Sequence, residues 1–143
     1  MHNLNIRCAS PDDIERIMEL EAGGFHQRIQ EEQSVMLKRM HHFPQGFLVL
    51  ANDSDVALAY LCSELWEIGS NLPHTAFALG HDIKDTHRAD GSQLYISSMT
   101  VAPECRGSGL GKKFFQQSVH MLRAQLTHVR GAILLLSAEW TGA

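Results

Sequence analysis

The stretch from Leu94 to Lys112 reads LYISSMTVAPECRGSGLGK, and it decides the fold. Its first part is apolar and rich in strand-forming residues, which predicts a strand over residues 94–101. A bend containing proline follows, then an arginine and three alternating glycines, and then a helix that begins at Leu110. Unpaired backbone N–H groups and the positive end of a helix dipole converge at such a turn. The pattern therefore predicts a site for a phosphate group.

The glycine spacing excludes two other phosphate-binding motifs. A dinucleotide fingerprint, G-x-G-x-x-G, would need its third glycine at Lys112. A phosphate loop, G-x-x-x-x-G-K-[ST], would need a glycine at Arg106 and a hydroxyl at Lys113. What remains is R-x-x-G-x-G over residues 106–111. A glycine-rich turn that binds no ligand is the alternative interpretation of these six residues alone.

This motif, with the strand and bend before it and the helix after it, resembles the acetyl-coenzyme A (acetyl-CoA) binding motif of the GNAT family of N-acetyltransferases. The segment from Glu64 through a long connection to the glycines is similar in layout to the arylalkylamine (serotonin) N-acetyltransferase branch of that family. The resemblance covers nearly the whole chain.

Composition indicates one soluble globular unit. The chain has 143 residues, of which 44% are hydrophobic and 20% charged, so we expect a single domain over residues 1–143. The net charge is −4, and no basic cluster exceeds two residues, which argues against a nucleic-acid partner. No apolar run, residues 132–136 included, is long enough to cross a membrane, and the N-terminus lacks a signal-peptide pattern. We therefore expect a cytoplasmic protein without a membrane partner.

Cysteine and histidine spacing predicts neither disulfides nor a metal. Cys8, Cys62 and Cys105 are too widely spaced for a disulfide framework or a zinc site, so we expect reduced thiols. Cys105 lies beside an arginine and a predicted helix start, which would lower its pKa, although an incidental small residue is the simpler interpretation. Nine histidines include the pairs His41-His42 and His81 with His87, yet neither spacing matches a known metal motif.

Hydrophobic periodicity predicts the element order β-α-α-β-β-β-α-β. The predicted strands are residues 4–8, 47–51, 56–65, 94–101 and 132–136, and the predicted helices are 10–24, 27–40 and 110–126. The run 132–136 is continuously apolar, which is typical of a strand buried on both faces. Residues 66–93 lack a clean period, and we expect them to form a lid or pocket wall. The order resembles the GNAT fold, an α/β fold with a mixed, mostly antiparallel central sheet flanked by helices.

The resemblance implies a set of residues that bind acetyl-CoA, since pantetheine in this family lies along the strand before the glycines. The backbone N–H of Met99 would stabilise the oxyanion, and Val101 would hold the pantetheine. The amides of the turn would hold the pyrophosphate, with Arg106 and Lys112 or Lys113 adding positive charge. The implied cofactor set is Met99, Thr100, Val101, Arg106, Gly107, Ser108, Gly109, Leu110, Gly111 and Lys112.

The base that deprotonates the amine has three candidates. An alkylamine has a pKa near ~10 and must lose a proton before it attacks. The arylalkylamine branch uses H-x-H on the strand before the glycines, and the matching positions here are Tyr95 and Ser97. The two-residue period of a strand places both on one face, where they can relay protons. Glu64 is the third candidate, with a solvated strand-end carboxylate as its simpler interpretation.

The resemblance implies a cytoplasmic N-acetyltransferase that transfers an acetyl group from acetyl-CoA to the primary amine of a small molecule. Acetylation of a protein N-terminus or lysine, and a non-catalytic acetyl-CoA-binding domain, are the alternatives. In the family, the strand that matches residues 132–136 is followed by a helix, often with a tyrosine acid, and by two more strands. The chain ends at Ala143 and holds only Tyr60 and Tyr95. We therefore expect a homodimer through the C-terminal strand.

Overall fold

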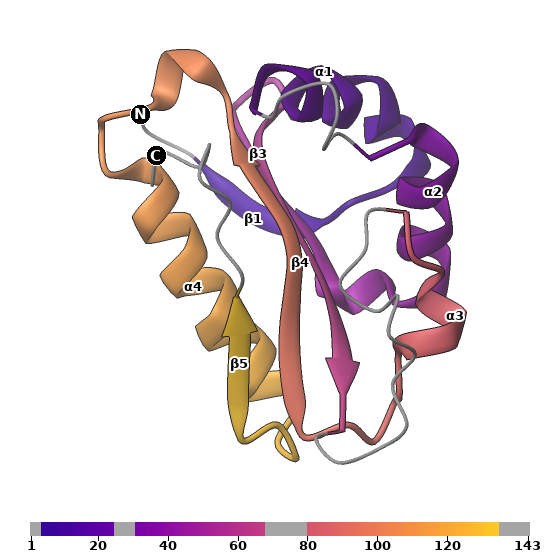
Figure 1. Ribbon diagram of the computed structural model, residues 1–143. Helices are drawn as coiled ribbons and strands as arrows, with labels where there is room; N and C mark the ends of the chain where they lie inside the picture. Colours follow the sequence, from indigo (N-terminus) through magenta and orange to yellow (C-terminus); the bar gives the residue numbers. More distant parts are fainter. Residues whose placement is uncertain (1–3, 25–30, 68–79, 135–143) are drawn as a thin grey trace.

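A computed structural model describes residues 4–24, 31–67 and 80–134. Its five strands form one sheet in the order β1-β2-β3-β4-β5. The pairs up to β4 are antiparallel, and β4 pairs with β5 in parallel (Figure 1). This confirms the predicted mixed, mostly antiparallel sheet. The strands are β1 (Asn5–Cys8), β2 (Phe47–Ala51), β3 (Ala57–Trp66), β4 (Gln93–Val101) and β5 (Gly131–Leu134).

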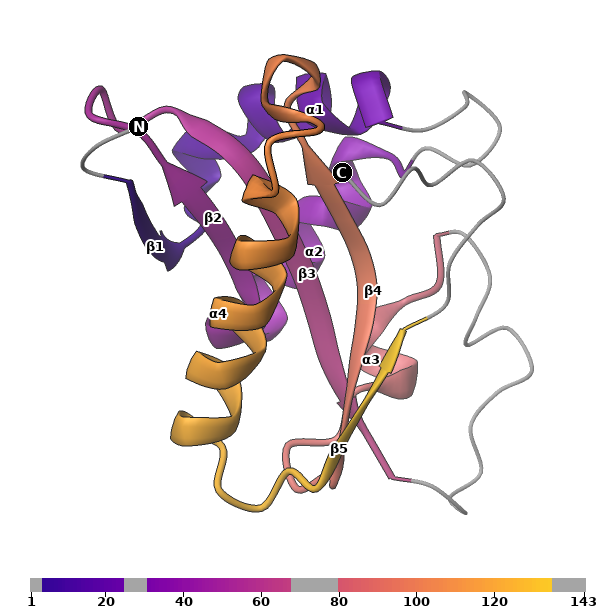
Figure 2. The ribbon, with the colours of Figure 1, turned by 90° about the vertical axis from the view of Figure 1, so that its left-hand side faces the viewer.

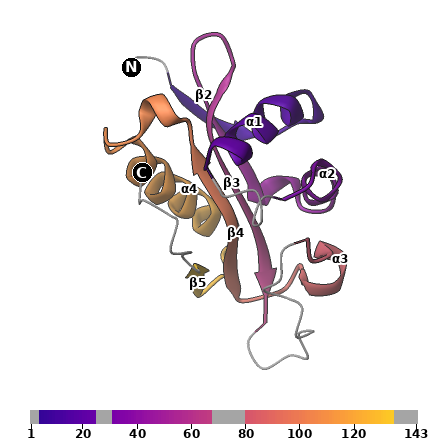
Figure 3. The same cartoon turned by 45° about the horizontal axis from the view of Figure 1, so that its top comes forward.

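Helices cover both faces of this sheet. The helices are α1 (Ile14–Gly24), α2 (Gln33–His42), α3 (Ile83–Thr86) and α4 (Leu110–Gln125), with short 3-10 turns at Pro11–Asp13, Pro44–Gly46 and Pro103–Cys105. Helices α1, α2 and α3 lie on one face, and α4 lies on the other (Figure 3). We call these the α1–α3 face and the α4 face.

The core forms around β3, the middle strand of the sheet. All of β3 except Leu58 is buried. Ile17 of α1 and Met36 of α2 are fully buried in the same core, and Phe114 of α4 is almost fully buried there. Further apolar residues of α4, such as Phe115 and Val119, lie at helical spacing and pack against this core. A stripe at helical spacing thus fixes α4 across the sheet.

The structure differs from the predicted elements in three places. The second helix begins at Gln33 rather than at residue 27, and Glu32 before it is extended. Ala132 in β5 is exposed, so the prediction of a strand buried on both faces is wrong at that residue. The predicted lid contains α3 and the first residue of β4, which a search for long periodic segments does not detect. Its residues 68–79 lie outside the described part.

The predicted homodimer edge also lies partly outside the described part, since residues 135–143 follow β5 there. Cys8, Cys62 and Cys105 are all free cysteines, as predicted. In the described ranges no helix is both long and apolar enough to span a bilayer.

Gly91 lies two residues before β4, and the structure has no room for a side chain at this position. A Cβ at this position would lie 2.7 Å from the carbonyl oxygen and 2.9 Å from the nitrogen of Trp66. These are backbone atoms of a buried strand, so moving them away costs considerable free energy. We therefore expect Gly91→Ala to lower the free energy of unfolding by about 1–3 kcal/mol in urea denaturation, as overpacking does. Gly23→Ala is the control, because its Cβ would make an ordinary 3.6 Å contact with Pro103. Equal stabilities of the two variants would contradict the prediction.

Candidate functional site

Strand β4 leads into α4 through the glycine turn, residues 106–111, which lies at the top of the molecule in Figure 2. Gly107 and Gly109 both have φ +80°, in the left-handed region. A residue with a Cβ pays about 1–2 kcal/mol to adopt that conformation, so the backbone path itself requires glycine. Gly109 then forms the N-cap of α4. The predicted strand–turn–helix arrangement is confirmed.

The start of α4 offers backbone donors that the helix itself does not use. The first helical amide with a backbone partner is that of Lys113, which donates to Gly109 O at 3.1 Å, whereas the Leu110 amide makes only a long 3.4 Å contact with Ser108 Oγ. The N-cap residue has no capping side chain, and the first turn holds no acidic residue. Among the residues that the structure describes, and apart from the chain neighbours of each glycine, no atom comes within 4 Å of a Cβ built on Gly107 or Gly109. The turn therefore presents backbone donors and the positive helix end to an approaching anion.

Arg106 fastens the glycine turn to α1. Its Nη2 donates to the Gly23 carbonyl at 2.9 Å, and its Nε approaches the Val101 carbonyl at 3.3 Å. The guanidinium thus fixes the turn while it brings positive charge to the end of β4. Lys112 and Lys113 are both exposed in the first turn of α4.

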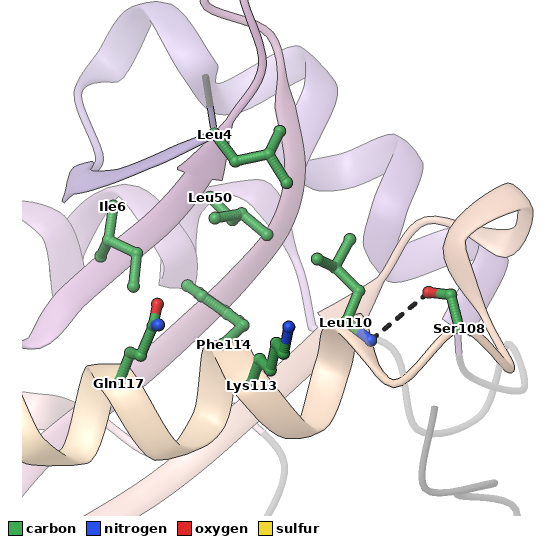
Figure 4. Close-up of a pocket in the computed structure, with 8 residues that line it drawn as sticks. All are labelled: Leu4, Ile6, Leu50, Ser108, Leu110, Lys113, Phe114 and Gln117. Carbon is green, nitrogen blue, oxygen red and sulfur yellow. Dashed lines mark hydrogen bonds between the residues drawn. The ribbon is translucent and has the colours of Figure 1, made fainter. Parts of the chain in front are cut away.

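A groove of about 490 Å³ lies on the α4 face beside this turn, between the start of α4 and strands β1 and β2. Figure 4 shows Leu4, Ile6 and Leu50 on the sheet side and Lys113 and Phe114 on the helix side. Its walls are both apolar and polar, and Ser108 and Leu110 of the predicted cofactor set line its end.

Strand β4 loses one neighbour halfway along its length. Its pairing with β5 runs from Gln93 opposite Gly131 to Ile96 opposite Leu134. Within the described ranges, residues 97–101 have no strand partner on that side, although β3 pairs with β4 up to Val101. Met99, Thr100 and Val101 of the predicted cofactor set belong to this open edge. An open strand edge can pair with an extended chain that carries amide groups.

A β-bulge lies at the first residue of the open edge. Ser63 pairs with Ile96 and Cys62 pairs with Ser98, so Ser97 is an extra residue. Its hydroxyl donates to the Cys62 carbonyl at 3.2 Å. The predicted two-residue period from Tyr95 to Ser97 is therefore interrupted. The register places Ser98 instead on the face of Tyr95, because their partners Cys62 and Glu64 are two residues apart on β3.

Glu64 is the centre of a buried hydrogen-bond cluster on the α1–α3 face, and its exposed fraction is 0%. Its carboxylate accepts from Trp66 Nε1 at 2.6 Å, from Thr86 Oγ1 at 2.7 Å and lies 2.9 Å from His81 Nε2. Burial by itself would raise the pKa of Glu64, but the hydrogen bonds from His81, Thr86 and Trp66 bring that pKa below its ordinary value. The interpretation of Glu64 as a solvated strand-end carboxylate is wrong, because α3 covers it.

Tyr95 lies against this cluster. It pairs with Glu64 across the β3–β4 ladder, and its ring stacks on Trp66 with 3.9 Å between centroids. Burial raises the pKa of its phenol, and the neighbouring Glu64 raises it further. Tyr95 thus joins the Glu64 cluster to the first half of β4.

A second buried cluster, which we call the Glu21 cluster, links α1, α2 and the sheet. Tyr60 donates to Glu21 Oε1, and its hydroxyl lies 2.7 Å from Ser98 Oγ. Glu21 Oε2 accepts the Glu31 amide at 2.6 Å, and the Glu31 carboxylate accepts from Arg39 Nη2 at 2.8 Å. Burial raises the pKa of Glu21. Arg39 is 1% exposed, and its Nε and Nη1 have no hydrogen-bond partner among the described residues.

Sequence reasoning missed the Glu21 cluster, although one signal was available. Glu21 continues the apolar stripe of α1 at helical spacing after Ile14, Ile17 and Met18. A charged residue on a core-facing stripe must find a partner inside the protein. That partner, Tyr60, lies 39 residues away in the chain.

The histidines lie in separate surroundings. His81 contacts Glu64, whereas His87 packs against the rings of Phe43 and His42. Among the described residues, no group of three or more His, Cys, Asp and Glu side chains has the arrangement of a metal site. Burial raises the pKa of Cys105, so the interpretation of that residue as an activated thiol is wrong.

Comparison with known proteins gives one family and one fold. The model of the acetyltransferase (GNAT) family matches residues 14–136. No curated protein sequence matches the chain. The loading GNATL domain of CurA from Lyngbya majuscula is 18% identical with a TM-score of 0.81, and the match covers 94% of this chain and 65% of that one. The GphF GNAT-like decarboxylase, in complex with isobutyryl-CoA, is 17% identical with a TM-score of 0.77, over 91% of this chain and 64% of that one.

A third similar structure is a GNAT family acetyltransferase from Brucella melitensis in complex with acetyl-CoA. It is 18% identical with a TM-score of 0.63, and the match covers 96% of this chain and 78% of that one. At these identities the similarity shows the fold. The chain spans less than two thirds of the first two structures, as the 64% and 65% coverages state.

The His87 ring makes stability depend on pH. Its Nδ1 accepts the Leu65 amide at 3.0 Å, which requires the neutral ring, and burial together with His42 lowers the pKa of His87. Because the folded pKa lies below the unfolded value of about 6.5, the contribution is complete above about pH 6.5 and is lost as pH falls through the folded pKa. We expect His87→Asn, whose amide oxygen can accept the same hydrogen bond, to weaken this decrease in unfolding free energy below about pH 6.5. His120→Asn, at an exposed position, is the control. An unchanged pH slope in His87→Asn would contradict the assignment.

Proposed function

Because the chain belongs to the acetyltransferase (GNAT) family, we propose that it is an N-acetyltransferase that uses acetyl-CoA as its acetyl donor. The acceptor is the primary amine of a small molecule, which attacks the thioester directly. The observation that carries the proposal is the open edge of β4, which ends in a turn of backbone donors at the start of α4. An extended arm with a pyrophosphate at one end fits that combination.

The proposed cofactor contacts follow from this arrangement. The turn amides of residues 106–111 bind the pyrophosphate, and Arg106 and Lys112 contribute charge. The edge residues Met99, Thr100 and Val101 bind the pantetheine arm, with the Met99 amide as oxyanion donor. A backbone donor in a strand paired to β3 is fixed before the reaction and needs no reorganisation.

Charge on the α1–α3 face supports a cationic acceptor. Three carboxyl groups are buried or nearly buried there, those of Glu21, Glu31 and Glu64. Arg39 is the one buried arginine among the described residues. Carboxyl groups outnumber the buried arginine, so their ionised forms would give this face a negative surplus and attract an ammonium group that approaches β4 from it. The same face holds Tyr95 and Glu64 of the predicted catalytic set, while Ser97 lies in the bulge beside them.

The catalytic roles of Tyr95, Ser97 and Glu64 remain predictions. The Glu64 carboxylate accepts several side-chain donors, and its lowered pKa makes it a weak base. Its proposed contribution is to hold the Trp66 ring, on which the Tyr95 ring stacks.

Decarboxylation of a carboxylated acyl-CoA is the second candidate function. It is favoured by the TM-scores of 0.77 and 0.81 for a GNAT-like decarboxylase and a loading GNATL domain, against 0.63 for the acetyltransferase from Brucella melitensis. The negative surplus on the α1–α3 face opposes a second carboxylate there. We therefore place acetyl transfer first.

Turnover separates these functions. The purified chain is incubated with acetyl-CoA and with 2-phenylethylamine, putrescine or a short peptide, and free thiol is measured. We expect thiol release with at least one small amine and less with the peptide. Thiol release with the peptide alone would indicate protein acetylation. Conversion of malonyl-CoA to acetyl-CoA and carbon dioxide, with no thiol released from acetyl-CoA in the presence of any amine, would overturn the proposal in favour of the second candidate.

Gly109→Ala tests the cofactor site. An alanine resists the φ of +80° that the turn adopts at this position, at a cost of about 1–2 kcal/mol. If acetyl-CoA binds this backbone conformation, its affinity should fall by about tenfold in calorimetry, since about 1.4 kcal/mol corresponds to tenfold. Gly80→Ala is a matched control, because Gly80 has φ +76° in a different loop. We expect it to lose stability and retain acetyl-CoA affinity. Equal affinities of the two variants would argue against a phosphate site at the glycine turn.

A further inference from the structure

We infer that Ser98, Tyr60 and Glu21 form a proton relay that takes a proton from the acceptor amine at the open edge of β4 and delivers it to Glu21. The inference rests on the proposed function. It assigns the base to a carboxyl group that the sequence pattern had placed among core residues.

The geometry connects the three groups without a gap. Ser98 Oγ lies 2.7 Å from the Tyr60 hydroxyl, and that hydroxyl is hydrogen-bonded to Glu21 Oε1. Ser98 is partly exposed, whereas Tyr60 is 0% and Glu21 1% exposed. The chain of hydrogen bonds therefore has one end that a ligand can reach and one end that is buried.

The reachable end lies at the proposed reaction centre. Ser98 is the second residue after the last β4–β5 pair, which involves Ile96, and it directly precedes Met99. The bulge at Ser97 turns Ser98 towards the α1–α3 face, where Tyr60 lies. An amine that attacks a thioester beside the Met99 amide would meet the Ser98 hydroxyl first.

The direction of the hydrogen bonds is fixed when Glu21 is ionised. A carboxylate only accepts, so Tyr60 donates to Glu21 and Ser98 must then donate to Tyr60. The Ser98 oxygen keeps a lone pair for a proton from the ammonium. One proton enters at Ser98 Oγ, one passes from Ser98 to Tyr60, and one passes from Tyr60 to Glu21 Oε1. The products are a neutral amine and a protonated Glu21, with both hydroxyls unchanged.

The surroundings of Glu21 suit a base. Burial raises its pKa towards the working range of the reaction, in contrast to Glu64, whose pKa is lowered. The titratable and charged groups that face Glu21 are Tyr60 from β3, Glu31 from the segment before α2, and Arg39 from α2. The negative charge of Glu31 disfavours the ionised form of Glu21, whereas the positive charge of Arg39 favours it. The relay thus ends on a carboxyl group whose two charged neighbours shift its pKa in opposite directions.

The test compares pH profiles of kcat/KM for Glu21→Gln, Tyr60→Phe and wild type, with the best acceptor from the amine panel. The amide side chain that Glu21→Gln introduces can still accept the Glu31 amide and contact Tyr60, so we expect this variant to fold. At about pH 7 we expect each variant to lose about 100-fold or more, a typical contribution of a general base. The deficit should shrink about tenfold per pH unit up to about pH 9, because the free fraction of an alkylamine with a pKa of about 10 rises by that factor.

Ser118→Ala is the control, since the Ser118 hydroxyl is buried on α4 without a hydrogen-bond partner in the described part of the chain. We expect a wild-type profile for it. A deficit in Tyr60→Phe that is constant with pH would indicate a structural role and overturn the relay, and so would a wild-type profile of either relay variant. Should Glu21→Gln fail to fold in a thermal unfolding assay, Tyr60→Phe alone decides. Absence of wild-type turnover with every amine overturns both the relay and the proposed function, and it is seen before any variant is compared.

Discussion

The hydrogen-bonded ladder between β3 and β4 is the constraint on which the rest of the structure depends. It runs from Ala59 opposite Val101 to Trp66 opposite Gln93, through the middle of the sheet. Strand β3 supplies Tyr60 and Glu64, and β4 supplies Tyr95, Ser98 and the path into the glycine turn. Because β3 is buried along almost its whole length, the position of each polar group on the ladder is fixed by packing rather than by loops.

The ladder keeps two buried acidic clusters apart and gives them different properties. Both Glu21 and Glu64 lie on the α1–α3 face, and both are almost completely removed from solvent. Glu64 receives three side-chain donors, so its ionised form is favoured in spite of burial. Glu21 accepts hydrogen bonds from one hydroxyl and one amide, and the effect of burial prevails over them, so its pKa is raised. The pKa values of the two carboxyl groups therefore shift in opposite directions, and in the proposed relay only Glu21 acts as a base.

The sequence predicts the fold well where its signals are local. The strand–turn–helix unit over residues 94–126 follows from apolar runs and glycine spacing, and the structure confirms it. The hairpin of β2 and β3 is likewise local, with its turn at residues 52–56. The Glu21 cluster is not local, because it joins residues from α1, β3 and β4 that no short pattern connects. The burial of Glu64 depends on α3, a helix of four residues that is too short for a periodic signal.

The bulge at Ser97 has a consequence for how β4 can vary. In a regular strand, odd and even positions look to opposite sides, so Tyr95 and Ser98 would be on different sides. One extra residue changes the parity of the strand at its midpoint, and thereby puts an aromatic ring, a hydroxyl and a buried carboxylate on one side of the sheet. If Ser97 paired with Cys62 instead of bulging out, every later residue would change sides, and Ser98 and Thr100 would exchange sides with Met99 and Val101. The spacing along β4 is therefore as much a part of the site as the chemistry of its side chains.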